Sequence, residues 1–146
     1  MNLCANIPRN TLVAFDNFFT SCNLMEDLYE KGIYAVGTAR CNRKDLPEIM
    51  KNKQPKALKL QKHQFASVTA EPITAIKWFD TKEVSVLTTA HIPLDIMFIN
   101  QTQKDGSKQK VLCPTANAVY TLSMGGVDLF DHFRSSYPIS RKSRKF

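Results

Sequence analysis

Residues 12–38 read LVAFDNFFTSCNLMEDLYEKGIYAVGT, and this stretch decides the fold class. It opens with an apolar run, typical of a buried strand, that stops at the turn former Asp16. A helix is predicted next, capped by Thr20 or Ser21 and ended by Gly32, and a second strand follows it. Strand, helix and strand form the smallest unit of an α/β sheet.

The chain after residue 62 is predicted to be mostly β as far as residue 90. Three runs have strand character, at 64–69, 73–79 and 83–90, and residues 80–82 are predicted to form a hairpin turn between the last two. The polar stretch 101–110 is predicted to be a loop.

Helical character returns at residues 115–133, where two glycines, Gly125 and Gly126, are expected to interrupt or open a helix. That would place Asp128 at the N-cap, with Asp131 on the same side three residues later. One interpretation is an acidic, capped helix start. The other is a site for Mg²⁺ or Mn²⁺, since such ions take carboxylate oxygens and serve phosphoryl displacement in pairs about 4 Å apart.

Asp16 also has two interpretations. It follows the carboxyl end of an apolar strand, the edge at which open α/β sheets bind their ligands. Alternatively, its side chain caps the turn that follows.

Positive charge is concentrated in one segment. The net charge is +7, and residues 40–62 hold eight Lys or Arg against Asp45 and Glu48. Such a surface favours polyanions, with nucleic acid before an acidic membrane surface, although a solvated lysine-rich loop would have the same composition. The candidate nucleic-acid contacts are Arg40, Arg43, Lys44, Lys51, Lys53 and Lys56, together with Arg141, Lys142, Arg144 and Lys145 near the end of the chain.

Other functional classes have little support. The sequence has no glycine-rich phosphate loop, no Cys-x-x-Cys pair and no apolar run long enough to span a membrane, so kinase, zinc and membrane functions are not indicated.

Four blocks of sequence, in this order and spacing, strongly resemble the piggyBac transposase family. They are FDNFFTS from Phe15, GIYAVGTARCNR from Gly32, KWFDTKEV with LTTAH from Lys77, and MGGVDLFD from Met124. Together they span nearly the whole chain.

The resemblance implies a fold of the α/β class, an incomplete RNase H-like core interrupted by a mostly β insertion domain. Residues 1–44 and 115–146 would belong to the core and residues 45–114 to the insertion. It implies metal-dependent DNA cleavage and strand transfer by an aspartate triad, with Mg²⁺ as cofactor. Asp16 would be the second aspartate, Asp128 the third and Asp131 an accessory carboxylate. DNA at transposon ends or in chromatin would be the partner, with no membrane partner, a nuclear location and a homodimer in a full-length context.

The family's first aspartate lies on a strand upstream of Asp16, in a region that this sequence does not contain. We therefore expect weak or absent Mg²⁺ binding and no catalysis by this chain alone, because ligand number and geometry govern magnesium affinity. The alternative is that the protein is not an enzyme but a non-catalytic, transposon-derived protein that binds DNA or chromatin.

Overall fold

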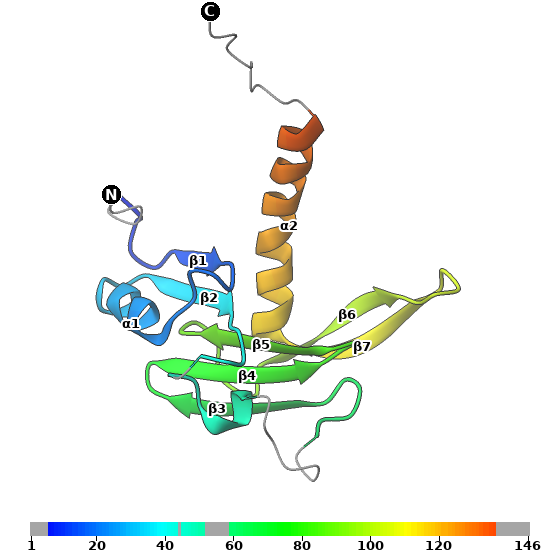
Figure 1. Cartoon of the computed structure of the whole chain (residues 1–146), viewed down its shortest axis with the longest axis horizontal. Coiled ribbons are helices and arrows are strands. Elements are labelled where there is room, and N and C mark those ends of the chain that lie inside the picture. Colours follow the sequence, from blue (N-terminus) through cyan, green and yellow to red (C-terminus); the bar gives the residue numbers. More distant parts are fainter. Residues whose placement is uncertain (1–5, 44, 52–58, 137–146) are drawn as a thin grey trace, which may run out of the picture.

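The computed structural model describes residues 6–43, 45–51 and 59–136. The elements along the chain (Figure 1) are β1 (Leu12–Phe15), α1 (Cys22–Glu30), β2 (Tyr34–Thr38), the 3₁₀ helix η1 (Glu48–Met50), β3 (Phe65–Ala70), β4 (Ile73–Phe79), β5 (Glu83–Thr88), β6 (Ile96–Thr102), β7 (Lys108–Pro114) and α2 (Thr115–Ser136). This mixed α/β content agrees with the predicted fold class at that level.

The predicted strand, helix and strand of residues 12–38 are confirmed. Ser21 caps α1, because its side chain accepts a hydrogen bond from the Leu24 backbone N–H. Gly32 has a φ of 74°, the left-handed conformation that glycine adopts easily at a helix end. The chain then returns so that β1 and β2 pair in parallel.

Five strands form one sheet in the order β1-β2-β5-β4-β3, with every pair antiparallel except β1 and β2. The predicted strands at 64–69, 73–79 and 83–90 correspond to β3, β4 and β5. Because β5 pairs with β2, the sheet runs without interruption from the segment predicted as core into the segment predicted as insertion. The division into core and insertion stays a prediction. Its boundary does not coincide with a boundary between two sheets, because strands from both segments belong to the same sheet.

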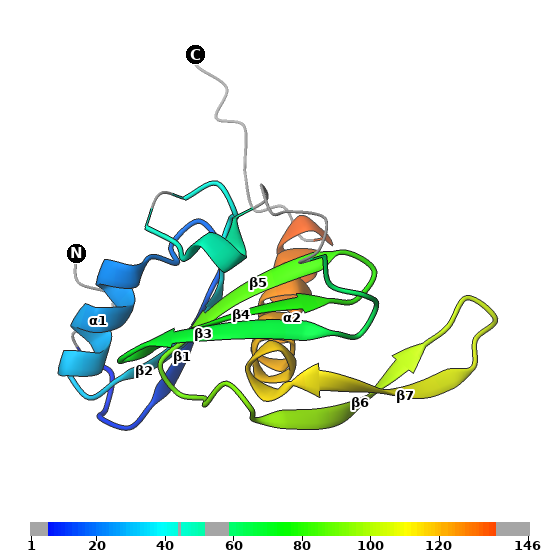
Figure 2. The same cartoon turned by 90° about the horizontal axis from the view of Figure 1, so that it is seen from below.

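Alternate residues of the central strands pack on opposite faces of this sheet. Ala35 of β2 and Leu87 of β5 belong to a buried cluster with Met25 of α1. Their neighbours Val36 and Val86 pack instead with Ala116 of α2. Hence α1 covers one face of the sheet and the first turn of α2 covers the other, as the two views show (Figures 1 and 2).

The predicted loop at 101–110 is wrong at both ends. Thr102 still belongs to β6, and residues from Lys108 onward belong to β7, so the two strands form an antiparallel ribbon. The turn at Asp105 and Gly106 is confirmed, with a φ of 84° at the glycine. The sequence shows no alternation of apolar and polar residues here, because both faces of the ribbon are largely solvated near its turn.

The predicted interruption of the last helix is also wrong. α2 runs from Thr115 through Gly125 and Gly126 without a break, so Asp128 lies within the helix and is not its N-cap. An interior glycine costs about 1 kcal/mol relative to alanine, which a helix anchored by three buried residues in its first turn tolerates. Among the described helices, none is both long and apolar enough to cross a membrane.

Candidate functional site

Asp16 follows the carboxyl end of β1, as predicted. In the parallel pair, Phe15 lies opposite Gly37, so the next residues along each strand, Asp16 and Thr38, reach the same edge of the sheet. This edge is where open α/β sheets place their ligands.

Tyr120 connects α2 to that edge. The Thr38 hydroxyl donates a hydrogen bond to the Tyr120 hydroxyl oxygen at 3.1 Å, across a separation of 82 residues. Tyr120 also packs against the buried cluster of Val36 and Ala116. The second turn of α2 is therefore held at the end of β2.

One face of α2 continues from Tyr120 past the end of the sheet. Residues spaced by three or four lie on the same side of a helix, which aligns Tyr120 with Met124, Val127 and Asp131. A cleft of about 410 Å³ lies between this face and the end of β1, and its lining residues are Asp16, Tyr120, Thr121, Met124, Val127, Asp128 and Asp131. The three carboxylates predicted as site residues thus share one cleft.

The carboxylate of Asp16 also caps its own turn. Its Oδ1 accepts a hydrogen bond from the Asn17 backbone N–H at 2.6 Å. Its backbone carbonyl accepts from the backbone N–H of Thr20 at 3.2 Å and from the Thr20 hydroxyl at 3.0 Å. The turn-cap interpretation is therefore confirmed, and it coexists with the position of Asp16 in the cleft.

Two arginines that follow β2 hold the loop after Asp16. Arg40 donates from Nε to the side-chain oxygen of Asn17 at 2.9 Å. Arg43 donates from Nη2 to the backbone carbonyls of Asn17 and Phe18, each at 3.0 Å. Contact of these arginines with DNA stays a prediction, and the contacts within the chain give both a structural role that the sequence did not reveal.

Thr20 and Gly37 pack too closely to admit a larger residue. A Cβ atom placed on Gly37 would lie 2.3 Å from the Thr20 hydroxyl oxygen and 3.1 Å from the carbonyl oxygen of Phe15. Thr20 is fully buried. The absence of a side chain at Gly37 therefore lets the loop that starts at Asp16 fold back onto β2.

Of the remaining predicted nucleic-acid contacts, Lys51 lies among the described residues. Lys51 forms an ion pair with Glu48 at 2.5 Å, so its charge is already partly balanced. Outside the described residues lie Lys44, Lys53, Lys56, Arg141, Lys142, Arg144 and Lys145.

The carboxylates of the cleft have the right chemistry for Mg²⁺, because hard cations take oxygen ligands. Their spacing does not complete a site, since the described part of the chain contains no group of three or more His, Cys, Asp or Glu side chains arranged to hold a metal ion. Within residues 6–43, 45–51 and 59–136, the arrangement is thus an acidic cleft and not a closed set of ligands.

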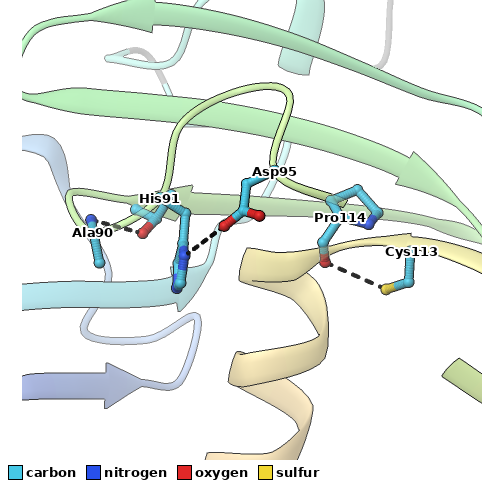
Figure 3. A network of polar contacts seen from close by, with 6 residues as sticks. Ala90, His91, Asp95, Cys113 and Pro114 are labelled. Carbon is cyan, nitrogen blue, oxygen red and sulfur yellow. Dashed lines mark hydrogen bonds and ion pairs between the residues drawn. The ribbon is translucent and has the colours of Figure 1, made fainter. Parts of the chain in front are cut away.

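A larger cleft of about 850 Å³ lies elsewhere and contains none of the predicted site residues; its lining includes Glu26, Glu30, Glu71 and His91. Beside it, His91 points toward Asp95 (Figure 3), with 3.3 Å between Nδ1 and Oδ2. The carbonyl of Asp95 accepts a hydrogen bond from the Thr115 N–H at 2.9 Å. These contacts attach the segment before β6 to the start of α2.

Sequence reasoning missed four lining residues of the smaller cleft: Val127, and before the two glycines Tyr120, Thr121 and Met124. The helical spacing of the three earlier residues from Asp128 and Asp131 was a usable signal, but the break expected at the glycines assigned them to a different helix.

Three comparisons with known proteins agree. Residues 1–146 match the family described as Transposase IS4. Human "PiggyBac transposable element-derived protein 2" is 25% identical over 136 residues, which cover 92% of this chain and 23% of that protein. A cryo-EM structure of a piggyBac transposase synaptic complex with hairpin DNA is similar in fold, with a TM-score of 0.65 and 23% identity, covering 92% of this chain and 26% of that one. The chain therefore spans about a quarter of the length of each relative.

Proposed function

Because the chain belongs to the Transposase IS4 family, we propose that it forms the part of a piggyBac-type DNA transposase that carries Asp16, Asp128 and Asp131. The piggyBac resemblance seen in four sequence blocks is confirmed. In this proposal the three carboxylates belong to the site at which a DNA strand is cleaved and transferred.

The shared cleft is the observation that supports the proposal. Asp16 reaches it from the end of β1. Asp128 and Asp131, which lie more than a hundred residues later in the sequence, reach it from α2. Both aspartates on α2 are exposed, as is Asp16, so substrate has access to them.

Magnesium is proposed as the cofactor on the chemistry of these oxygen donors. When bound, a divalent ion would polarise phosphate oxygens and favour strand cleavage. Since the described residues contain no complete set of ligands, the contribution of this chain is limited to supplying and holding carboxylates. Arg40 and Arg43 hold the loop next to Asp16 by their hydrogen bonds to Asn17 and Phe18.

We further propose that β1, α1, β2 and α2 belong to an RNase H-like catalytic core, and that residues 45–114 are an insertion that extends its sheet. The parallel pairing of β1 with β2, and the packing of α1 and α2 on opposite faces, support this assignment. DNA as partner, a nuclear location and a homodimer in a longer protein are parts of the same proposal.

Metal-directed cleavage of the protein backbone tests the carboxylate site without requiring catalysis. The purified chain is loaded with Fe²⁺, treated with ascorbate and peroxide, and the cut positions are mapped. Because the ligand set within the described residues is incomplete and binding is expected to be weak, Fe²⁺ and the competing Mg²⁺ are used at millimolar concentration. We expect cuts near residues 16 and 128 that excess Mg²⁺ suppresses and that Asp16→Asn or Asp128→Asn abolishes. The matched control is Asp27→Asn, an exposed carboxylate on α1 outside the cleft, which should leave the cuts unchanged.

Random or absent cutting by the folded chain would refute a metal site in this cleft. If such a chain still bound DNA, the non-catalytic alternative would replace the proposed function. Conversely, magnesium-dependent cleavage of a terminal-repeat duplex, lost in Asp128→Asn, would show that the chain is catalytic by itself.

A further inference from the structure

The ribbon formed by β6 and β7 projects from the rest of the molecule, and its turn lies far from the five-stranded sheet (Figures 1 and 2). Successive residues of a strand point to opposite faces, so the pairing register divides the ribbon into two sets of side chains. The two sets have different environments.

The inner face is attached to the body of the protein. Cys113 is buried and belongs to a cluster with Trp78 and Ala118, and Ile99 packs against that cluster. Farther toward the turn, Gln101 donates a hydrogen bond to an Asp80 carboxylate oxygen at 2.6 Å. These contacts fix the inner face against the sheet and leave the opposite face free.

The outer face combines an exposed aromatic side chain with basic and polar ones. The register pairs Phe98 with Leu112, Asn100 with Lys110, and Thr102 with Lys108, which places all six residues on this face. Every one of them is exposed, and Phe98 retains 66% of its accessible surface. The aromatic ring of Phe98 is therefore open to a ligand on the same face of the ribbon as Lys110.

No carboxylate opposes the charge of this face. From Ile96 to Pro114 the ribbon contains three lysines and a single acid, Asp105. Its carboxylate lies in the turn, where Oδ1 accepts hydrogen bonds from the Ser107 backbone N–H at 2.9 Å and the Ser107 hydroxyl at 2.6 Å. The outer face is thus positive and can receive an anionic polymer.

We propose that the outer face of this ribbon binds a DNA strand, with Lys108 and Lys110 on its phosphates and Phe98 stacked on an unpaired base. The inference rests on the proposed function for the identity of the polymer. Lysines supply the electrostatic part of nucleic-acid binding, and aromatic side chains beside a basic track stack on bases of single strands. The bases of an intact duplex are already stacked, so Phe98 favours unpaired nucleotides.

Fluorescence anisotropy on the purified chain tests this assignment, with a labelled single-stranded oligonucleotide and its duplex titrated at several salt concentrations. Lys108→Ala and Lys110→Ala should each reduce the salt slope for the single strand by about 0.7. Phe98→Ala should weaken single-strand binding by about 5- to 150-fold, the effect of one stacked base, and should affect the duplex much less.

Two controls separate this mechanism from others. Lys31→Ala removes an exposed charge at the end of α1 and should change neither affinity nor slope. Phe98→Leu keeps an apolar side chain but cannot stack, so it should behave like Phe98→Ala, whereas Phe98→Trp should restore binding. If Phe98→Leu bound like the native chain, the stacking role would be refuted, and a protein-docking patch would be the better explanation.

If both lysine variants are folded by circular dichroism and keep the native affinity and salt slope for the single strand, the proposed DNA binding by the ribbon is overturned. In that case, backbone cutting near residues 16 and 128 would still support the proposed function, so the two failures are distinguishable. A complete lack of DNA binding at low salt would overturn the ribbon assignment together with DNA as the partner of this chain.

Discussion

Arg43 and Phe18 are joined by a hydrogen bond of 3.0 Å from the guanidinium Nη2 to the backbone carbonyl oxygen. A second bond of the same length joins Arg43 to the carbonyl of Asn17. The residue thus attaches the segment after β2 to the loop that begins at Asp16, and the position of that carboxylate depends on a side chain far along the chain.

Arg43→Ala should lower the free energy of unfolding by about 1.5–2 kcal/mol, the lower part of the range for hydrogen bonds from charged groups, because the freed carbonyls can be hydrated. Urea unfolding measures this loss, and Arg43→Lys should recover part of it. An Arg43→Ala chain of native stability that binds DNA more weakly would instead assign Arg43 to DNA contact.

Gly37→Ala should destabilise the fold by about 1–3 kcal/mol, the usual effect of overpacking, because the new Cβ would lie 2.3 Å from the Thr20 hydroxyl oxygen. In Thr20→Ala the clashing atoms are absent, so the double variant should lose less stability than the sum of the single changes. Strict additivity in urea unfolding would show that the clash is not the cause.

Gly125→Ala should raise stability by about 0.5–1 kcal/mol, because alanine is the better helix former and nothing lies within 4 Å of the added Cβ. The same change at Gly106, which has a φ of 84°, should instead destabilise by about 1–2 kcal/mol. Thermal unfolding compares the two variants. A loss of stability in Gly125→Ala would indicate that α2 is interrupted in solution, as the sequence alone suggested.

Burial, with a smaller contribution from Asp80, raises the pKa of the Cys113 thiol from 9.0 to about 11. Below pH 9 the thiol is protonated in the folded and unfolded chains alike. Between pH 9 and 11 only the unfolded chain ionises, so the free energy of unfolding should fall as the pH rises through this window.

The measurement is urea unfolding at pH 8, 9.5 and 10.5 for the native chain and Cys113→Ala. The variant should lose less stability over this range, since it lacks the buried thiol while all other titrating groups are unchanged. Parallel curves for the two proteins would contradict the assignment of this pH dependence to Cys113.

The sequence by itself determined β1, α1 and β2, with the Ser21 cap, the left-handed Gly32 and the place of Asp16 at a strand end. These features depend on neighbours within a few residues, through side-chain periodicity, capping and turn chemistry, and such preferences are visible in a single stretch of sequence. The same reasoning located β3, β4 and β5 but not their order in the sheet.

Only the tertiary structure decided how distant segments meet. In the structure, α2 continues unbroken through two glycines, because packing at the start of the helix outweighs their local cost of about 1 kcal/mol each. The tertiary structure also joined Thr38 to Tyr120 and so brought Asp128 and Asp131 to the cleft of Asp16. Contacts of this kind arise from the packing of whole helices and strands against one another. The free energy of that packing is shared among many residues, so no single stretch of sequence reveals it.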